Sequence, residues 1–453
     1  MQTAKEVQEA FERDGIRHVK VGGFDIEATL RGKYVSIEKF SSIVENGMGF
    51  CDVIFGWDIH DRLYDRPGMT GWHTGYPDTN ARIDLTTYRR MPWEPGTACF
   101  LLDFENPDGQ PLPASPRQLL KKVIDRAKSM GFVPKMAVEY EFFIYQESAW
   151  SIQEKGFRGL KTLDPGMFGY SWLRTSQSAT LVHDVLDMLR DFRCPLEGFH
   201  TETGPGIYEA ALAYTDALEM ADRAALFKTA MKEICTRHGA LASFMAKPSA
   251  SLPGCSGHIH QSLWSADEKQ NIFHDDARAD HLSQTFRHYI AGQVALMPEL
   301  CALIAPNVNS YKRLLGGEWA PSHATWGTDN RTCALRTITG QNKKATRIEY
   351  RLAASDINPY IAMAASLAAG LYGIENQLEP PAPVTGNAYE ADESLRLPTS
   401  LAGAVERLAK SSTARSLLGD AFVDHYLLTR AFEVRQAEKA VTDWELARYL
   451  ETA

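Results

Sequence analysis

The clearest periodicity in the chain is a strand-like alternation in "PKMAVEYEFFIYQE", residues 134–147. Every second residue from Met136 to Ile144 is apolar, so this segment is predicted to be a β-strand with one face in a hydrophobic core. Glu139 and Glu141 fall on the opposite face. The pattern therefore predicts two carboxylates held side by side on a rigid strand.

Two later segments, "SGHIHQSL" and "TRIEYRL", repeat this division into an apolar and a polar face. Their polar faces carry His258, His260, Ser262, Arg347, Glu349 and Arg351. If the three strands belong to one curved sheet, their polar faces line a common cleft.

The chain divides into two predicted units of the α+β class. Residues 1–105 begin with a helix and continue with short strand-like runs such as "HVKVGGFDI" and "ATLRGKYVSI". Residues 106–115 have the proline, glycine and aspartate content of a linker. Ser115 and Pro116 suit the first positions of a following helix, and residues 116–453 alternate short strands with helices.

Composition narrows the class of protein. The 453 residues are 44% hydrophobic and 23% charged, with a formal charge of −9, which gives no overall electrostatic reason to bind nucleic acid or an anionic membrane. Seven scattered cysteines without a CxxC pair favour a reducing cytoplasm. The apolar run at 359–374 is short and rich in alanine and glycine, and it predicts a buried helix rather than a membrane span. We expect a cytoplasmic protein.

Further acids accompany the paired glutamates. The segment "HTETGPGIYEAAL" adds two around a Gly-Pro-Gly turn, so that the candidate metal ligands are Glu139, Glu141, Glu202, Glu209, His258 and Glu349. So many acids in one place would repel one another unless cations neutralised them. Oxygen-rich ligation with one imidazole favours Mg²⁺ or Mn²⁺ over zinc, and six ligands suffice for two ions.

Cationic residues follow the same strands. The segments "NSYKRLLGGEW", "DNRTCALRT" and their continuation supply Lys312, Arg313, Arg331, Arg336, Lys344, Arg347 and Arg351. Arginines beside divalent cations suit ligands that are themselves strongly anionic, such as a nucleotide and a carboxylate. Taken singly, each element also matches a solvated face or a surface ion-pair network. Because the same division into an apolar and a polar face recurs on three strands, we favour a common binding site over unrelated surface charges.

Six blocks, in order along the chain, resemble the glutamine synthetase family: "EYEFF", "ETGPGIYEA", "SGHIHQSL", "NVNSYKRL", "WGTDNRTCALR" and "RIEYRLAASDINPYIAMAASLAAG". The resemblance implies an N-terminal β-grasp domain (1–105), the linker (106–115) and a catalytic domain (116–453) on a curved antiparallel sheet. It also implies a homo-oligomer of stacked hexameric rings, a dodecamer, with each active site between one N-terminal domain and a neighbour's catalytic domain.

The resemblance further implies a role for each polar position. The first metal ion would be held by Glu141, Glu202 and Glu209, and the second, beside the nucleotide phosphates, by Glu139, His258 and Glu349. Glutamate would be bound by Arg313, Arg351 and Gly254. The transferred phosphoryl group would be stabilised by Arg331 and Arg336. The nucleotide would contact His260, Ser262, Lys344, Arg347, Glu197 and Tyr214.

The implied chemistry is the ATP-dependent formation of γ-glutamyl phosphate from L-glutamate, followed by displacement of phosphate by an amine. Members that use ammonium carry a flap glutamate in "GYEAP". Here the segment reads "GGEWAP", with Trp319 in that position and Glu318 displaced by one residue. Asp58, in "IFGWDIHD", is the candidate that still supplies a carboxylate to the amine site.

An indole cannot accept a proton from ammonium, although it can contact an apolar amine. The sequence therefore predicts a γ-glutamylamide synthetase whose amine carries an alkyl or aryl group. Two alternatives stay open at this point. One is a glutamine synthetase that uses ammonium through Asp58 and Glu318. The other is a non-catalytic, ring-forming homologue, which would be expected to lose metal ligands.

Overall fold

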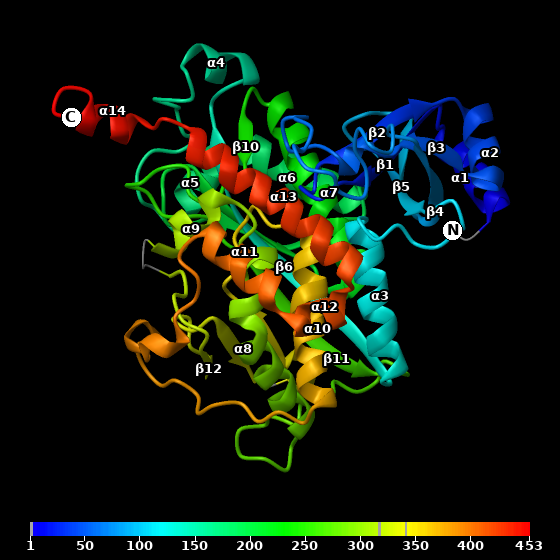
Figure 1. Ribbon diagram of the computed structural model, residues 1–453. Coiled ribbons are helices and arrows are strands. Elements are labelled where there is room, and N and C mark those ends of the chain that lie inside the picture. Colours follow the sequence, from blue (N-terminus) through cyan, green and yellow to red (C-terminus); the bar gives the residue numbers. More distant parts are fainter. Residues whose placement is uncertain (1–2, 316–318, 340–341) are drawn as a thin grey trace.

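The computed structural model describes residues 3–315, 319–339 and 342–453. It contains two sheets, each with its own helices, so the predicted α+β class is confirmed (Figure 1). Glu318, one candidate for the missing flap carboxylate, lies outside the described residues.

The first sheet forms the blue part of Figure 1 and has the strand order β2-β1-β5-β4-β3. Its central pair, β1 and β5, is parallel, whereas the other neighbours are antiparallel, as a β-grasp fold requires. The strands are β1 (His18–Phe24), β2 (Leu30–Val35), β3 (Met48–Cys51), β4 (Asp78–Arg90) and β5 (Thr97–Glu105). Helices α1 (Ala4–Asp14) and α2 (Ile37–Asn46) bury Phe11 and Phe40 against this sheet.

The second sheet has the main order β12-β13-β14-β11-β6-β8-β7, with β9 and β10 also paired to β6. Every described pair is antiparallel except β12 with β13. The strands are β6 (Phe132–Tyr145), β7 (Leu196–Thr201), β8 (Ile207–Leu212), β9 (Thr215–Asp216), β10 (Leu241–Ser243), β11 (Gly257–Ser265), β12 (Trp326–Thr328), β13 (Leu335–Ile338) and β14 (Arg347–Tyr350). The three strands predicted from alternation are β6, β11 and β14, and they are neighbours.

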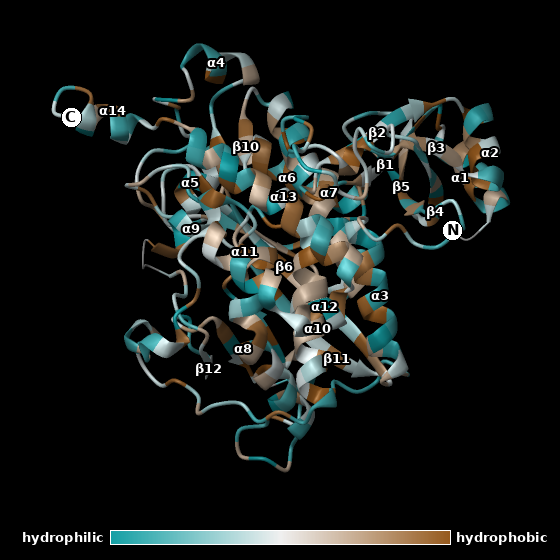
Figure 2. Cartoon of the chain, in the orientation of Figure 1, coloured by the Kyte–Doolittle hydropathy of each residue, from teal (hydrophilic) through white to brown (hydrophobic). Residues whose placement is uncertain are grey.

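Most of the remaining helices belong to the second unit, where several pack against the strands of this sheet, while η1 belongs to the first unit. The longer ones are α3 (Pro116–Ser129), α6 (Ala179–Asp191), α7 (Ala217–Arg237), α8 (Gln284–Ile304), α10 (Pro359–Glu375), α11 (Leu401–Lys410) and α13 (Asp420–Lys439). The shorter ones are α4 (Ala149–Glu154), α5 (Trp172–Gln177), α9 (Val308–Leu315), α12 (Ser412–Leu418) and α14 (Asp443–Tyr449), with 3₁₀ turns at η1 (Asp52–Phe55), η2 (Lys343–Ala345), η3 (Ala388–Glu390) and η4 (Glu393–Leu395). Figure 2 shows hydrophobic and hydrophilic residues interspersed along α3, whose apolar side chains are buried.

Helix α3 starts where the sequence predicts, with Ser115 at the N-cap position and Pro116 at the first turn. The apolar run at 359–374 forms the buried helix α10, as expected. Glycines allow α10 to lie directly on α8, because a Cβ added at Gly373 would stand 2.0 Å from the carbonyl oxygen of His288. Throughout the described ranges, we find no helix with the length and apolar character needed to traverse a bilayer.

A buried guanidinium fastens the first sheet to the second unit. Arg117, at the start of α3, donates to Asp222 of α7 at 2.9 Å. It also donates to Asp84 of β4 and Asp103 of β5, each at 2.8 Å. A buried charge needs such paired and hydrogen-bonded partners. The three carboxylates come from three elements, so this contact fixes how the first sheet sits on α7.

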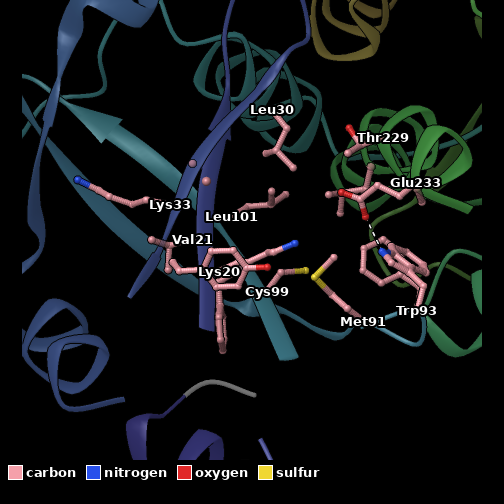
Figure 3. A pocket seen from close by; sticks show the side chains of 17 residues that line it. Lys20, Val21, Leu30, Lys33, Met91, Trp93, Cys99, Leu101, Thr229 and Glu233 are labelled. Carbon is pink, nitrogen blue, oxygen red and sulfur yellow. Dashed lines mark hydrogen bonds between the residues drawn. The ribbon is translucent and has the colours of Figure 1, made fainter. Parts of the chain in front are cut away.

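A cavity of about 230 Å³ lies at the same boundary, between β1, β2, β5 and α7 (Figure 3). Its wall is largely apolar, and Met91, Trp93 and Leu101 line it. The Trp93 indole N–H donates to Glu233 of α7, a contact drawn in Figure 3. This cavity is separate from the polar face of the second sheet.

Candidate functional site

The strand register places the predicted polar residues in rows across the second sheet. His258 of β11 is opposite Glu139 of β6, while His260 is opposite Glu349 of β14, and Glu349 is opposite Arg336 of β13. Directly opposed residues on one face lie about 5 Å apart, so the register itself brings acids, imidazoles and a guanidinium into contact range. The predicted common polar face therefore exists.

The first cluster on this face contains Glu139, His258, His260 and Glu349. His258 Nδ1 lies 3.2 Å from Glu349 Oε1 and 3.8 Å from Glu139 Oε2, and His260 Nε2 lies 3.2 Å from Glu139 Oε1. Burial would raise the pKa of both carboxyl groups, but the imidazoles outweigh it and hold both pKa values below their ordinary range. Both glutamates are thus kept ionised.

Hydrogen bonding gives the two imidazoles different roles. His258 Nδ1 faces carboxylates and must carry a proton, which leaves the lone pair on Nε2. His260 Nδ1 instead accepts from Arg347 Nε at 3.2 Å, so its proton is on Nε2, toward Glu139. His258 is therefore the imidazole with a free ligand atom, and His260 orients Glu139.

A second cluster lies on the neighbouring strands β7 and β8. His200 Nε2 is 3.5 Å from Glu202 Oε2 and 3.6 Å from Glu209 Oε1. Burial lowers the pKa of His200, but the two carboxylates outweigh it and the net shift is upward. Burial, together with the charges of Glu139 and Glu141, raises the pKa of Glu209 to about 7. Repulsion of this kind is what a bound cation would relieve.

Sequence reasoning missed His200. Its ring stacks on Tyr170, with centroids 4.3 Å apart and planes at 9°, and this contact holds the imidazole over the two acids. A signal was present in "HTETG", because His200 and Glu202 alternate around buried Thr201 just as the residues of the other strands do. The segment is short and precedes a turn, which hid the pattern.

Glu141 stands slightly apart from both clusters. It is opposite Glu209 in the register, and its Oε2 accepts from the backbone N–H of Ser256 at 2.7 Å. That bond orients the carboxylate into the cleft. The structure thus brings together all six predicted metal ligands on adjacent strands, with His200 as an addition.

The residues fit divalent cations. Over the described part of the chain, the Nε2 atoms of His200 and His258 are buried and have no hydrogen-bond partner. Two groups, Glu139 with His260 and Glu349, and His200 with Glu202 and Glu209, bring three potential ligand atoms within 4.8 Å of one another. Buried polar atoms without partners are rare in native proteins, and carboxylate-rich clusters suit Mg²⁺ or Mn²⁺.

Arg313 is a buried cation whose described contacts are to backbone oxygens. It donates to the carbonyls of Leu352 at 3.0 Å and Arg351 at 3.2 Å. Burial, and next the nearby charge of Arg351, lower its pKa. Gly254 makes room for it, because a Cβ there would lie 2.9 Å from Arg313 Cγ and 2.8 Å from the carbonyl oxygen of Ala246. This guanidinium is placed to receive an anion.

The other predicted arginines surround Glu349. Arg351 donates to Glu349 Oε1 at 2.6 Å and to the carbonyl of Arg331 at 3.0 Å, and Arg336 donates to Glu349 Oε2 at 3.0 Å. Arg336 also bonds Asp329 at 2.9 Å. The Arg331 side chain is exposed to solvent.

The remaining predicted nucleotide contacts lie further out. Ser262 of β11 accepts from the indole of Trp264 at 3.0 Å, and Lys344 is exposed on η2. Glu197 is exposed on β7, and Tyr214 is exposed between β8 and β9. These four side chains therefore flank the acidic clusters.

A cavity of about 510 Å³ opens beside the clusters. Its polar lining comprises Glu141, Glu202, Thr203, Lys247, Ser251, Ser256, His258, Lys312, Arg313 and Arg351, and the rest is Met167, Ile207, Ala250, Leu252, Pro253, Gly254, Leu315, Trp319 and Ala320. Trp319 has positive φ (61°) and a side chain 64% exposed, and its carbonyl accepts from Arg351 Nη2 at 3.4 Å. Trp319 thus lies at this cavity, with its backbone joined to Arg351.

Asp58 is not among the residues that line this cavity in the described chain. It is buried in the loop after β3, where its Oδ1 accepts from the backbone N–H groups of His60 at 2.8 Å and Arg62 at 2.9 Å. Its carboxylate therefore shapes its own loop in the single chain.

Paired acidic clusters on a curled antiparallel sheet, ringed by arginines, define a class of nucleotide-dependent ligases. The family model "Glutamine synthetase, catalytic domain" matches residues 113–449, and this chain belongs to the glutamine synthetase family. It is a carbon–nitrogen ligase of the glutamine synthetase type, so the resemblance seen in the sequence is confirmed.

The relatives carry names of two kinds, glutamine synthetase and glutamate–amine ligase. "Type-1 glutamine synthetase 2" of Dictyostelium discoideum is 51% identical over 96% of this chain and 83% of its own length. "Glutamate--isopropylamine ligase" of a Pseudomonas species is 40% identical over 98% and 97%. The solved structure "GmaS/ADP complex-Conformation 1" has a TM-score of 0.85 at 28% identity, covering 99% of this chain and 100% of that one.

Proposed function

We propose that this ligase joins the γ-carboxylate of L-glutamate to an amine other than ammonium, at the expense of ATP and with Mg²⁺ or Mn²⁺. The observation that carries the proposal is Trp319, a residue that lines the same cavity as Glu141 and Arg313. It stands in the sequence position where ammonium-using members carry their flap glutamate. The residues proposed to bind metal ions, phosphate and carboxylate are thus present, while the residue proposed to face the amine differs.

The wall around Trp319 supports an amine with an apolar substituent. Met167, Leu252 and Leu315 line the cavity with it, and none of them can accept a proton or pair with a small cation. Burying apolar surface of a substituent there contributes about 25 cal/mol per Å², whereas an ammonium ion would gain nothing from this wall. An alkyl or aryl amine is the substrate class that this side favours.

The metal ions would be held by the acids described above. The first would use Glu141, Glu202 and Glu209, and the second Glu139, His258 and Glu349. The groups whose ligand atoms lie within 4.8 Å of one another share two acids with each of these sets and add His200 and His260. Bound divalent cations supply Lewis-acid neutralisation of the phosphate oxygens. Because Glu139 and Glu349 are held ionised, they are ready to bind cations at neutral pH.

The arginines would handle the anionic groups of the reaction. Arg313 and Arg351 would bind the carboxylates of glutamate, and Arg331 and Arg336 would face the transferred phosphoryl group. A γ-carboxylate oxygen of glutamate attacks the γ-phosphorus of ATP, and the bond to the ADP oxygen breaks. The amine nitrogen then attacks the acyl carbon, loses a proton, and phosphate leaves. His260, Ser262, Lys344, Arg347, Glu197 and Tyr214 are the proposed nucleotide contacts.

A glutamine synthetase that uses ammonium is the second candidate. The 51% identity to a protein named "Type-1 glutamine synthetase 2" favours it. The non-catalytic reading is weaker, because all six ligand positions hold acids or histidine. Asp58 does not line the described cavity of its own chain, so a role at the amine site requires that a neighbouring subunit supplies it. We propose that the subunits form a dodecamer of two stacked hexameric rings. The proposed location of this assembly is the cytoplasm.

The test is ATP-dependent phosphate release with L-glutamate and Mg²⁺ across ammonium, isopropylamine, ethanolamine, putrescine and aniline. We expect one amine class to exceed ammonium by at least about tenfold in kcat/KM. Stimulation by ammonium alone would establish the second candidate. If no amine stimulates phosphate release although metal and nucleotide still bind, the protein is a non-catalytic homologue.

A further inference from the structure

A group of metal-ligating side chains lies outside the catalytic face, in the loop between β11 and α8. His274, Asp276 and His281 each offer a ligand atom, and these atoms lie within 4.8 Å of one another. His274 Nε2 is 3.0 Å from Asp276 Oδ1. We propose that His274, Asp276 and His281 form a binding site for a transition-metal dication of the Zn²⁺ class.

The donor set differs from that of the catalytic clusters. Two imidazoles and one carboxylate suit Zn²⁺ and its neighbours, whereas Mg²⁺ prefers oxygen ligands and retained water. The His274 and His281 ring centroids are 5.4 Å apart. A tetrahedral zinc ion about 2.1 Å from one nitrogen of each ring would hold the centroids about 5 Å apart. The centroids already stand near the required spacing, and because the ring planes are at 12°, one imidazole has to turn to bring both nitrogens onto the ion. A fourth position is left for water.

The backbone holds the ligands before any metal binds. His274 pairs with Leu282 in an antiparallel bridge, and the N–H of Asp275 donates to the carbonyl of His281 at 3.1 Å. His281 itself has φ 57°, in the left-handed region that is uncommon for residues other than glycine. The loop is thus closed into a short hairpin that brings His281 back beside His274.

Two neighbours, Thr346 and Asp276, hold the ring of His274 in place. Its Nδ1 lies 3.1 Å from Oγ1 of Thr346, just before β14. Because a carboxylate only accepts, Nε2 carries the proton toward Asp276 Oδ1, and Nδ1 accepts from the Thr346 hydroxyl. A metal ion bound between Nε2 and Asp276 would replace that proton, and Nδ1 would then donate to Thr346. Asp276 meanwhile bonds the ammonium group of Lys343 through Oδ2, so this carboxylate is already paired with a cation. Lys343 is therefore a competitor of the metal.

The experiment measures Zn²⁺ bound to the full chain by equilibrium dialysis, in excess Mg²⁺ to occupy the catalytic acids. We expect wild type to bind one more Zn²⁺ per chain than the His274→Asn/His281→Asn variant. His238→Asn is the matched control, because His238 pairs with Asp184 at 2.9 Å on a different surface. That control should keep the wild-type stoichiometry.

Two single changes make the test independent of folding. Thr346→Val should weaken Zn²⁺ binding about tenfold, because it removes the partner of Nδ1. Lys343→Ala, at an exposed residue, should strengthen it because the competing ammonium group is gone. Equal stoichiometry in wild type and the double variant, or weaker binding in Lys343→Ala, would overturn the proposal. Neither readout depends on the catalytic activity.

Discussion

Arg351 donates from Nη2 to the backbone carbonyl of Trp319 at 3.4 Å, while its Nη1 holds Glu349 at 2.6 Å. One guanidinium therefore joins the proposed amine side of the cavity to the metal side. The backbone of Trp319 is thus held by the same residue that is proposed to bind the glutamate carboxylate.

Replacing the indole should change which amine is used. We predict that Trp319→Glu raises the ratio of ammonium-dependent to isopropylamine-dependent kcat/KM by at least about tenfold, because a carboxylate can accept a proton from ammonium and an indole cannot. Phosphate release with each amine measures the ratio. Trp444→Glu is the control, since Trp444 is 62% exposed on α14, compared with 64% for Trp319. An unchanged ratio in Trp319→Glu would remove Trp319 from the amine site.

Neutralising one predicted metal ligand should stop the reaction. We predict that Glu139→Gln lowers phosphate release by at least about 100-fold while the thermal midpoint stays close to that of wild type, because the amide keeps the shape and loses the charge. Glu154→Gln, at the exposed end of α4, should retain full activity. Activity preserved in Glu139→Gln would mean that the metal assignment is wrong.

Crowding the stem of Arg313 should weaken glutamate binding. A Cβ at residue 254 would lie 2.8 Å from the carbonyl oxygen of Ala246 and 2.9 Å from Arg313 Cγ, so either the backbone or the arginine must shift. We predict that Gly254→Ala raises KM for glutamate about tenfold and leaves KM for ATP nearly unchanged. Gly403→Ala, on α11 where the nearest atom is 3.4 Å away, should change neither constant. A rise in KM for ATP alone would contradict the role of Arg313.

Acid should destabilise the protein through a buried histidine. Burial, and next the charge of Arg430, lower the pKa of His425 on α13 to about 4, and neither of its ring nitrogens has a hydrogen-bond partner among the described residues. Because the folded pKa is below the unfolded value near 6.5, the stabilisation is fully present above pH 6.5 and is lost as the pH falls toward 4.

Between pH 7 and pH 5 this histidine should cost wild type roughly 2 kcal/mol of unfolding free energy. His425→Leu removes that titration, so its urea midpoint should fall less over the same interval. His183→Leu, on the exposed side of α6, should follow wild type. Parallel pH curves for wild type and His425→Leu would contradict this account.

The sequence predicted most of the site because period-2 alternation survives wherever one strand face is buried. The facing rule of β6, β11 and β14 located Glu139, His258 and Glu349, and the register then determined which of them meet. Alternation does not state which strands pair. The parallel pairing of β12 with β13 and the inclusion of β7 in the sheet required the structure.

Other features depend on contacts that local patterns do not encode. His200 sits on a short strand before a turn, and its place is fixed by a stack on Tyr170, which lies 30 residues earlier in the sequence. Trp319 could be noticed as a departure, but its bond to Arg351 crosses between distant segments. The sequence also could not predict that Asp58 bonds to its own loop, because aspartate is common both in binding sites and in turns.

Arg117 limits how freely this molecule can be divided and recombined. A fragment that begins near residue 113, where the family match starts, would keep Arg117 and Asp222 but lose Asp84 and Asp103. Part of a buried ionic network would then face water beside a newly exposed apolar surface. A chimaera that takes its first 105 residues from a relative would keep the Arg117 ion pairs only if that relative has carboxylates at the positions of Asp84 and Asp103. The first unit and the residues at 117 and 222 therefore have to be exchanged together.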